Sequence, residues 1–363
     1  MNNAVQYTDM KDSGIKWLGS VPAHWSIRTL YQLATRVNNK NSDLAEQNLL
    51  SLSYGKIKQK DINTNDGLLP ASFDGYNIIE AGDIVLRLTD LQNDHTSLRV
   101  GYATERGIIT SAYTTVRPIN PAHSRYLYYL IHAFDLKKGF YGMGSGVRQG
   151  LNYDEVKELR VVLPPKKEQD AIVAYLDLQC AKIDSIIEEA KCSIEEYKKW
   201  KSSVIFEVVT KGLDRKAALK DSNVQWVGLV PARWRILSLK FLCEMQAGKN
   251  ITADDITETG EYPVYGGNGL RGYYTDYNRE GTYLLVGRQG ALCGNVHRAN
   301  GKFWATEHAV VTNATSLADL SYLFYLLIAM NLNQYAPSTA AQPGLSVNVI
   351  QNVATVCPGI EEQ

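Results

Sequence analysis

The chain has 363 residues and carries 38 basic and 38 acidic side chains, which gives no formal net charge at pH 7. This length suits two domains of ordinary size with a connector. The balanced charge argues against a protein that grips DNA without local basic patches or partner subunits. The five cysteines form no Cys-x-x-Cys pair and no apolar run reaches about 18 residues, which predicts a soluble cytoplasmic protein without a zinc site or a disulfide framework.

A short segment near the start of the chain returns in its second half. Both copies follow the pattern W-x-G-x-x-P-x-x-W, and the residues that carry it are Trp17, Gly19, Pro22, Trp25, Trp226, Gly228, Pro231 and Trp234. A second match pairs residues 145–169 with residues 339–363, and both segments end in the pattern P-x-x-x-E-Q. Repetition at fixed spacing predicts a duplicated module. We expect the four tryptophans to be apolar anchors of the two modules rather than surfaces for stacking on bases.

The first module covers residues 1–163 and the second covers residues 213–363. Short β-like runs broken by Gly, Asn and Asp predict strands in both modules, at residues 48–53, 82–87, 110–116, 262–265, 282–286 and 309–312. One helix is expected in each module, at residues 124–132 and 320–328. The predicted fold class is therefore α+β, with two β-rich modules.

Residues 164–212, between the modules, predict one long helix. No Pro or Gly occurs from Glu168 to Lys211, and apolar residues recur at the spacing of a coiled coil. This predicted apolar seam contains Ile172, Leu176, Ile183, Ile186, Ile194, Tyr197 and Val204. Roughly 44 helical residues would form a rod of about 65 Å, and its seam would need a partner. The alternative is a helix folded over one of the modules.

The order of these parts resembles the specificity subunit of type I restriction-modification systems. The resemblance rests on the W-x-G-x-x-P-x-x-W segments, the segments that close the modules, and the long helix between them. It implies that each module is a target recognition domain that reads one half of a split site on double-stranded DNA. It also implies a helical spacer that docks modification (methyltransferase) subunits and, with them, ATP-dependent restriction subunits. No cofactor is expected in this chain, because S-adenosylmethionine, ATP and Mg²⁺ would belong to those partner subunits.

The resemblance also implies a second long helix after Gln363, where this sequence ends. The seam of the first helix would then lack a partner within the chain. We therefore expect the chain to self-associate or to pair with a second specificity polypeptide.

Direct reading of bases needs side chains with bidentate hydrogen-bonding geometry, such as Arg or Lys toward guanine and Asn or Gln toward adenine. In the first module the candidates are Lys56, Lys58, Lys60, Arg87, Arg99, Arg148 and Gln149. In the second module they are Lys249, Asn268, Arg271, Tyr273, Arg288, Gln289 and Arg298. The simpler interpretation of any one of them is a solvated loop residue, so the set carries more weight than its members.

The sequence lacks the common catalytic motifs. Residues 267–272 fit G-x-G-x-x-G, but the β-like run that follows does not supply the helix that a dinucleotide site needs. The six histidines show no metal-ligand spacing, and we expect each to be a surface or packed residue. We therefore predict a non-catalytic DNA-specificity subunit. The alternatives are a helical decoy protein that binds modification subunits without reading DNA, and a nuclease or methyltransferase.

Overall fold

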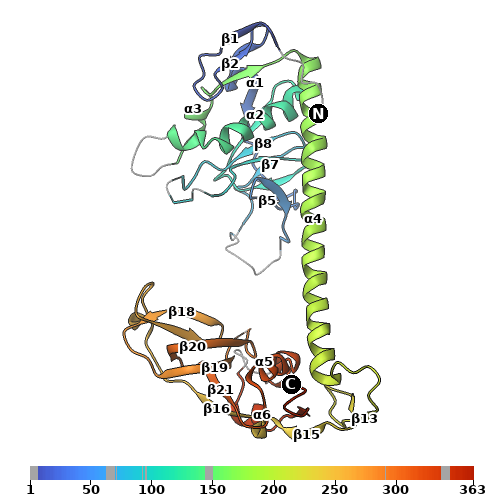
Figure 1. Ribbon diagram of the computed structural model, residues 1–363. Helices are drawn as coiled ribbons and strands as arrows, with labels where there is room; N and C mark the ends of the chain where they lie inside the picture. The colour runs from blue at the N-terminus through green and yellow to red at the C-terminus, as the bar shows by residue number, and fades with distance from the viewer. Residues whose placement is uncertain are drawn as a thin grey trace. The chain divides into compact units, whose positions relative to one another are not determined.

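The computed structural model describes residues 7–62, 70, 72–91, 93–94, 96–143, 150–290, 292–336 and 344–363. The chain divides into two compact units, Met1–Ile187 and Glu188–Gln363, and the long helix α4 (Lys166–Lys211) contributes one half to each (Figure 1). The predicted partition into residues 1–163, 164–212 and 213–363 instead treats this helix as a separate segment. The helix itself is confirmed, with 46 residues, as is the class of two mixed α/β modules.

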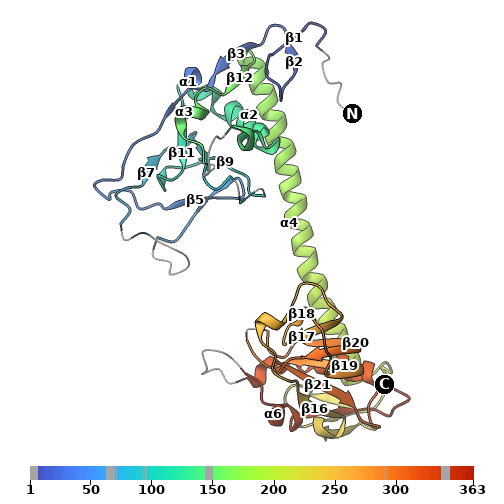
Figure 2. The same cartoon turned by 90° about the vertical axis from the view of Figure 1, so that its left-hand side faces the viewer.

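The first unit combines short antiparallel sheets with the 13-residue helix α2 (Ser124–Leu136), in addition to its half of α4 (Figure 2). A four-stranded sheet has the order β4-β11-β8-β9, and the other strands pair as β1-β2, β3-β12, β5-β6 and β7-β10. The strands are β1 (Met10–Asp12), β2 (Ser20–Pro22), β3 (Ser26–Thr29), β4 (Ala34–Arg36), β5 (Leu50–Ser53), β6 (Lys56–Gln59), β7 (Asn77–Ile79), β8 (Ile84–Leu86), β9 (Val100–Tyr102), β10 (Gly107–Ile109), β11 (Thr114–Pro118) and β12 (Arg160–Leu163). The helices are α1 (Leu30–Leu33), α2 (Ser124–Leu136) and α3 (Tyr153–Val156), with 3-10 turns η1 (Pro121–His123) and η2 (Gly139–Gly142).

The second unit has one six-stranded sheet with the order β16-β21-β19-β20-β17-β18 and two pairs, β13-β14 and β15-β22. The strands are β13 (Leu219–Asp221), β14 (Leu229–Pro231), β15 (Arg235–Ser238), β16 (Cys243–Ala247), β17 (Tyr262–Gly266), β18 (Gly269–Tyr274), β19 (Arg279–Gly287), β20 (Val296–Ala305), β21 (Ala309–Ala314) and β22 (Ala354–Cys357). The helices are α5 (Leu320–Ala329) and α6 (Val347–Gln351), with 3-10 turns η3 (Leu239–Phe241), η4 (Ala253–Asp255) and η5 (Leu332–Tyr335). Each strand and helix predicted within the two modules overlaps one of these elements.

The core of the second unit follows from the alternation of β19. Leu284 and Val286 pack with Leu326 of α5 in one cluster, whereas Leu285 packs with Phe303 of β20 in another. Successive side chains of a strand point to opposite faces of a sheet. Around these strands, apolar side chains therefore pack on both faces of the sheet.

The two sequence repeats meet in space within each unit. Trp25 Nε1 donates to Glu168 Oε2 at 2.9 Å, and Trp234 Nε1 donates to Glu362 Oε2 at 3.0 Å. Strand β3, which follows Trp25, pairs with β12, and β15, which follows Trp234, pairs with β22. The opening and closing segments recur together because they form one interlocked structure.

The closing glutamine makes the same contact in both units. Gln169 Nε2 donates to the Pro164 carbonyl oxygen at 2.7 Å, and Gln363 Nε2 donates to the Pro358 carbonyl oxygen at 3.1 Å. Trp234 is fully buried, and the other three tryptophans of the repeat are partly buried against apolar clusters. The prediction that they act as apolar anchors is confirmed.

We predict that Leu326→Ala lowers the free energy of unfolding of the second unit by about 2–5 kcal/mol, because Leu326 is fully buried and a cavity would remain. Leu229→Ala is the matched control in the same unit. Leu229 is 52% exposed, so its substitution should change stability by less than about 0.5 kcal/mol. Urea denaturation followed by circular dichroism measures both, and equal losses would contradict the assigned core.

Candidate nucleic-acid interface

Four segments of the second unit meet at one place, which we call the glycine junction. It consists of residues 248–249 after β16, residues 266–269 at the turn from β17 into β18, residues 287–289 at the end of β19, and residues 306–308 between β20 and β21. Backbone hydrogen bonds join these segments. Lys249 N donates to Ala305 O at 2.9 Å, and Arg288 N donates to His308 O at 3.0 Å.

Glycine is required where these backbones touch. A side-chain carbon on Gly287 would overlap the carbonyl oxygen of Gly267, and one on Gly248 would overlap the carbonyl oxygens of Ala305 and Thr306. Residues without a Cβ permit such close backbone approach. The junction is thus a tightly fitted piece of backbone from which neighbouring side chains project.

Five predicted DNA-binding residues gather at or beside the glycine junction: Lys249, Asn268, Arg271, Arg288 and Gln289. Arg288 is half-buried and the other four are exposed. Asn268 Oδ1 accepts a hydrogen bond from Asn295 Nδ2 at 2.9 Å, which orients its amide. The Arg271 side chain passes so close to Gly266 that a Cβ there would meet its Cδ at 2.5 Å. Their role in binding DNA stays a prediction.

The other two candidates of the second unit lie elsewhere. The Arg298 guanidinium carbon lies 4.6 Å from the ring centroid of Phe324 on α5, a cation–π contact that holds it against the helix. Tyr273 lies within β18, and its backbone exchanges hydrogen bonds with Thr257 at 2.9 and 3.0 Å. Neither residue takes part in the backbone contacts of the glycine junction.

In the first unit, the three predicted lysines lie on or next to strand β6 of a hairpin. Lys56 and Lys58 face the serines of β5, while Ile57 pairs with Leu52 and packs against the core. Lys56 Nζ lies 3.1 Å from Asp184 on α4 and so links the hairpin to the helix. Lys58 and Lys60 are exposed.

The tip of this hairpin carries an aromatic residue that sequence reasoning did not single out. Tyr54 has a φ angle of 48° and is 76% exposed. A two-residue turn with two positive φ angles, at Tyr54 and Gly55, suits the twist of a hairpin.

The prediction that Arg99 contacts DNA is wrong, because this side chain is fully buried. Its guanidinium donates to the backbone carbonyl oxygens of Arg87 (3.3 Å), Thr89 (2.7 Å), Asp90 (3.1 Å) and Asp94, and to the hydroxyl of Tyr141 (2.9 Å). Buried charged groups persist in proteins when such bonds satisfy them. Arg99 therefore holds the segment after β8 in place.

Arg87 is partly enclosed by the same segment. Its side chain is 30% exposed, and its Nη1 lies 3.5 Å from Asp94 Oδ2. Hydrogen bonds from Ser97 and from the backbone of Thr96 hold the pKa of Asp94 well below its usual range. Arg148 and Gln149 lie outside the described residues.

Sequence reasoning also missed residues that the glycine junction brings together. His297 and His308 are half-buried, in agreement with the expectation of surface or packed residues, but their place was not foreseen: a side-chain carbon on Gly269 would lie 3.3 Å from His297 Cε1, and His308 belongs to the junction itself. Burial lowers the pKa of His297, which favours a neutral ring at pH 7. The glycine-rich sequence segments beside these two histidines were the feature that could have indicated their place in the site.

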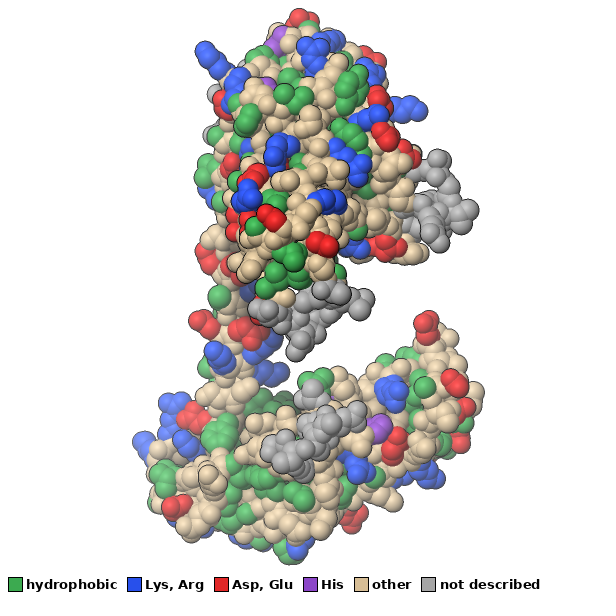
Figure 3. All heavy atoms as spheres, turned by 180° about the vertical axis from the view of Figure 1, so that it is seen from behind, with side chains coloured by type: hydrophobic (Ala, Val, Ile, Leu, Met, Phe, Trp, Pro, Cys, Tyr) green, Lys and Arg blue, Asp and Glu red, His purple; other side chains and the backbone are tan. Residues whose placement is uncertain are grey.

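The charges are mixed over the surface. In the view of Figure 3, Lys and Arg side chains are interspersed with Asp and Glu on each unit rather than gathered in one basic patch. Within the ranges that the structure describes, no group of three or more His, Cys, Asp or Glu could hold a metal ion, and no helix is both long and apolar enough to cross a membrane. Any binding of nucleic acid would therefore rely on local groups.

We predict that Arg99→Ala lowers the free energy of unfolding of the first unit by about 3 kcal/mol or more, because several buried carbonyl oxygens would lose their donor. Arg87→Ala, the same substitution at a partly exposed site, should cost about 1 kcal/mol or less. Thermal and urea unfolding compare the two variants. A small effect of Arg99→Ala would contradict a structural role for this residue.

The chain is similar in sequence to curated proteins, and these relatives agree with one another in their description. The chain is 49% identical over 126 residues to the type I restriction enzyme EcoprrI specificity subunit of Escherichia coli, a match that covers 34% of this chain and 31% of that protein. It is 24% identical over 214 residues to the type I restriction enzyme MjaVIII specificity subunit of Methanocaldococcus jannaschii, covering 58% of this chain and 43% of that one. Each match thus spans less than half of the relative's length.

A chain in a solved structure that describes complex assembly and conformational transition of the type I R-M system has a similar fold. The TM-score is 0.62 at 15% sequence identity, and the superposition covers 94% of this chain and 88% of that chain. The family model described as "Type I restriction modification DNA specificity domain" matches residues 22–196 and 231–363, which lie in both modules and make up more than half of the sequence. The chain therefore belongs to the type I restriction-modification DNA specificity domain family.

Proposed function

We propose that this chain is the DNA specificity subunit of a type I restriction-modification complex, and that each unit reads one half of a bipartite DNA site. The observation that carries the proposal is the glycine junction, where Lys249, Asn268, Arg271, Arg288 and Gln289 project from one fixed backbone structure. Side chains of these types hydrogen-bond to base edges in the major groove. A rigid scaffold with exposed polar loops is the common architecture of a recognition site.

The first unit would present a different surface to its half-site. The β5–β6 hairpin offers Lys58, Lys60 and the exposed Tyr54. Lysine can contact phosphate oxygens, and such contacts fix the register of a protein on DNA.

In this proposal the chain is not itself catalytic. Adenine methylation with S-adenosylmethionine would be carried out by modification subunits, and ATP-driven cleavage by restriction subunits. The mixed surface charge of this chain is compatible with partners that supply much of the contact to phosphate.

Helix α4 would provide the docking surface. Of the predicted seam, Ile172 and Leu176 are half-buried, whereas Ile183, Ile186, Ile194, Tyr197 and Val204 are exposed. Trp200, which the seam prediction omitted, is 66% exposed. Such a row of large apolar side chains on one helix is typical of an interaction surface.

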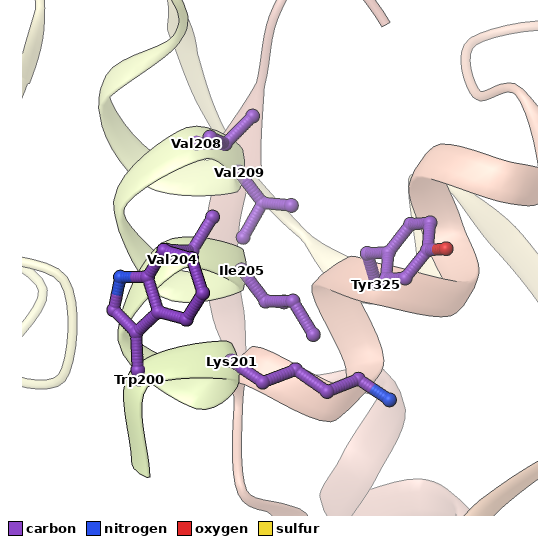
Figure 4. A pocket seen from close by; sticks show the side chains of 7 residues that line it. All are labelled: Trp200, Lys201, Val204, Ile205, Val208, Val209 and Tyr325. Atoms are coloured by element: carbon purple, nitrogen blue, oxygen red, sulfur yellow. The ribbon is translucent and has the colours of Figure 1, made fainter. Parts of the chain in front are cut away.

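Within the second unit this surface continues into an apolar groove of about 450 Å³. Figure 4 shows Ile205 and Val209 pointing from α4 toward α5, which contributes Tyr325 to the other wall. The remaining lining residues are Trp200, Lys201, Val204 and Val208.

The first unit indicates what kind of element fits there. Its helix α2 is anchored by Tyr126, whose hydroxyl donates to Val162 O at 3.1 Å, and three residues later Tyr129 donates to Asp177 of α4. Arg125 adds an ion pair of 2.7 Å with the same carboxylate. The face of α2 that bears Arg125 and Tyr129 is thus covered by a long helix.

The second unit repeats the anchor, but there α4 covers the helix only in part. The Tyr322 hydroxyl lies 3.3 Å from Val356 O and 3.2 Å from Val209 O of α4, and three residues later Tyr325 is 43% exposed in the groove. We therefore propose that the groove receives a long helix from a second specificity chain, and that the exposed seam also docks modification subunits.

The proposed function predicts that Arg271→Ala weakens binding of a cognate DNA duplex by the assembled complex, by roughly 1–3 kcal/mol if this side chain reaches a base. Arg298→Ala is the matched control, because it removes the same charge from a residue that stacks on Phe324. Fluorescence anisotropy at fixed salt measures both affinities. Equal losses of DNA affinity in the two variants would mean that Arg271 contributes only through its charge and makes no specific contact.

Mapping methylated adenines in the host genome with and without the gene tests the function itself. The specificity proposal expects a defined bipartite motif to lose its methylation when the gene is removed. If modification subunits bind the chain but no sequence-specific DNA binding results, the decoy alternative is favoured.

We predict that Val204→Glu reduces association of the chain with itself or with modification subunits at least tenfold, because a charge would enter the apolar groove. Ser203→Glu adds the same charge at the neighbouring exposed position, on another face of α4. Light scattering at micromolar concentration and co-purification with modification subunits report the outcome. A wild-type chain that stays monomeric and binds no modification subunit would refute the docking role.

A further inference from the structure

Three neighbouring residues of the glycine junction have polar atoms that are buried but have no hydrogen-bond partner within the described part of the chain. The atoms are Arg288 Nε, Glu307 Oε2 and His308 Nδ1. A buried polar group without a partner destabilises the folded state, so folded proteins rarely leave several together without a reason. A ligand that offers both an acceptor and a donor would satisfy two of them, Arg288 Nε and Glu307 Oε2.

The backbone places these residues side by side. The register that pairs Gly287 with Ala309 sets Arg288 opposite His308, and Arg288 N donates to His308 O at 3.0 Å. Glu307 is joined to the same group, because its Oε1 lies 3.0 Å from His308 Nε2.

The chemistry of the three side chains distinguishes between the parts of DNA. A phosphate group offers only acceptors and a negative charge, so it would pair with Arg288 but be repelled by the Glu307 carboxylate. Every base pair, by contrast, presents one exocyclic amino donor beside acceptor atoms in the major groove. The Arg288 Nε–H donor and the Glu307 Oε2 acceptor together complement such an edge.

We propose that Arg288 and Glu307 read one base pair of the half-site assigned to the second unit. Glu307 Oε2 accepts a hydrogen bond from the amino group of cytosine or adenine, and Arg288 Nε–H donates to a neighbouring acceptor of the same pair. His308 is a positioning residue that holds the carboxylate through Oε1. This inference rests on the proposed function and adds the residue pair and the kind of base contact.

The test uses the full chain assembled with its modification subunits and a library of randomised double-stranded DNA as the probe. Bound sequences are selected and read for the wild-type complex and for Glu307→Ala. We expect the variant to lose discrimination at one position by roughly tenfold, while preference at the other positions is retained. Glu280→Ala is the matched control, because it removes an exposed carboxylate from β19 of the same unit.

A second variant keeps the result interpretable if Glu307→Ala unfolds. Glu307→Gln preserves the shape of the side chain, and we expect it to change the preference at that same position while thermal unfolding stays near wild type. The inference fails if both folded variants keep the wild-type preference at every position, or if they change affinity equally for all sequences, as a residue near phosphate would. If the wild-type complex selects no sequence at all, the proposed function fails instead.

Discussion

The hydrogen bond from a tryptophan indole to a glutamate carboxylate organises each unit. In both units it joins the segment that opens the unit to the segment that closes it, next to the pairs β3-β12 and β15-β22. Glu168 lies in the first turn of α4, so in the first unit this bond also fixes where the long helix leaves the sheet. Apart from the hairpins β1-β2 and β13-β14, the other strands of the two units and the helices α1, α2, α3, α5 and α6 lie between these two joined ends in the sequence.

The candidate interface of the second unit depends on a different constraint, the close contact of backbones at Gly267 and Gly287. Apolar side chains pack on both faces of the sheet beside this contact, and Lys249, Asn268, Arg288 and Gln289 lie just beyond the ends of strands. Arg99 differs from these residues in the availability of its donors. That arginine has the chemistry of a DNA contact, but its donors are used by four carbonyl oxygens and by the Tyr141 hydroxyl inside the first unit.

The long helix could be predicted from the sequence because its signals are local: no Pro or Gly between Glu168 and Lys211, and apolar residues at coiled-coil spacing. The repeated segments were equally visible, although their contact in space was not. Burial of Arg99 and the meeting of Arg288 with Glu307 and His308 depend on pairings between distant strands. Those pairings cannot be inferred from the pattern of residue types along the chain.

The glycine junction separates the part of the loops that must stay constant from the part that is free to vary. Gly248 and Gly287 leave no room for a side chain, whereas the neighbouring positions 249, 268 and 289 are exposed. Substitution at those exposed positions alters the chemical groups that are offered but leaves the backbone path unchanged. Under the proposed function, a few exchanges at these positions would change the base preference of the unit without a change of fold.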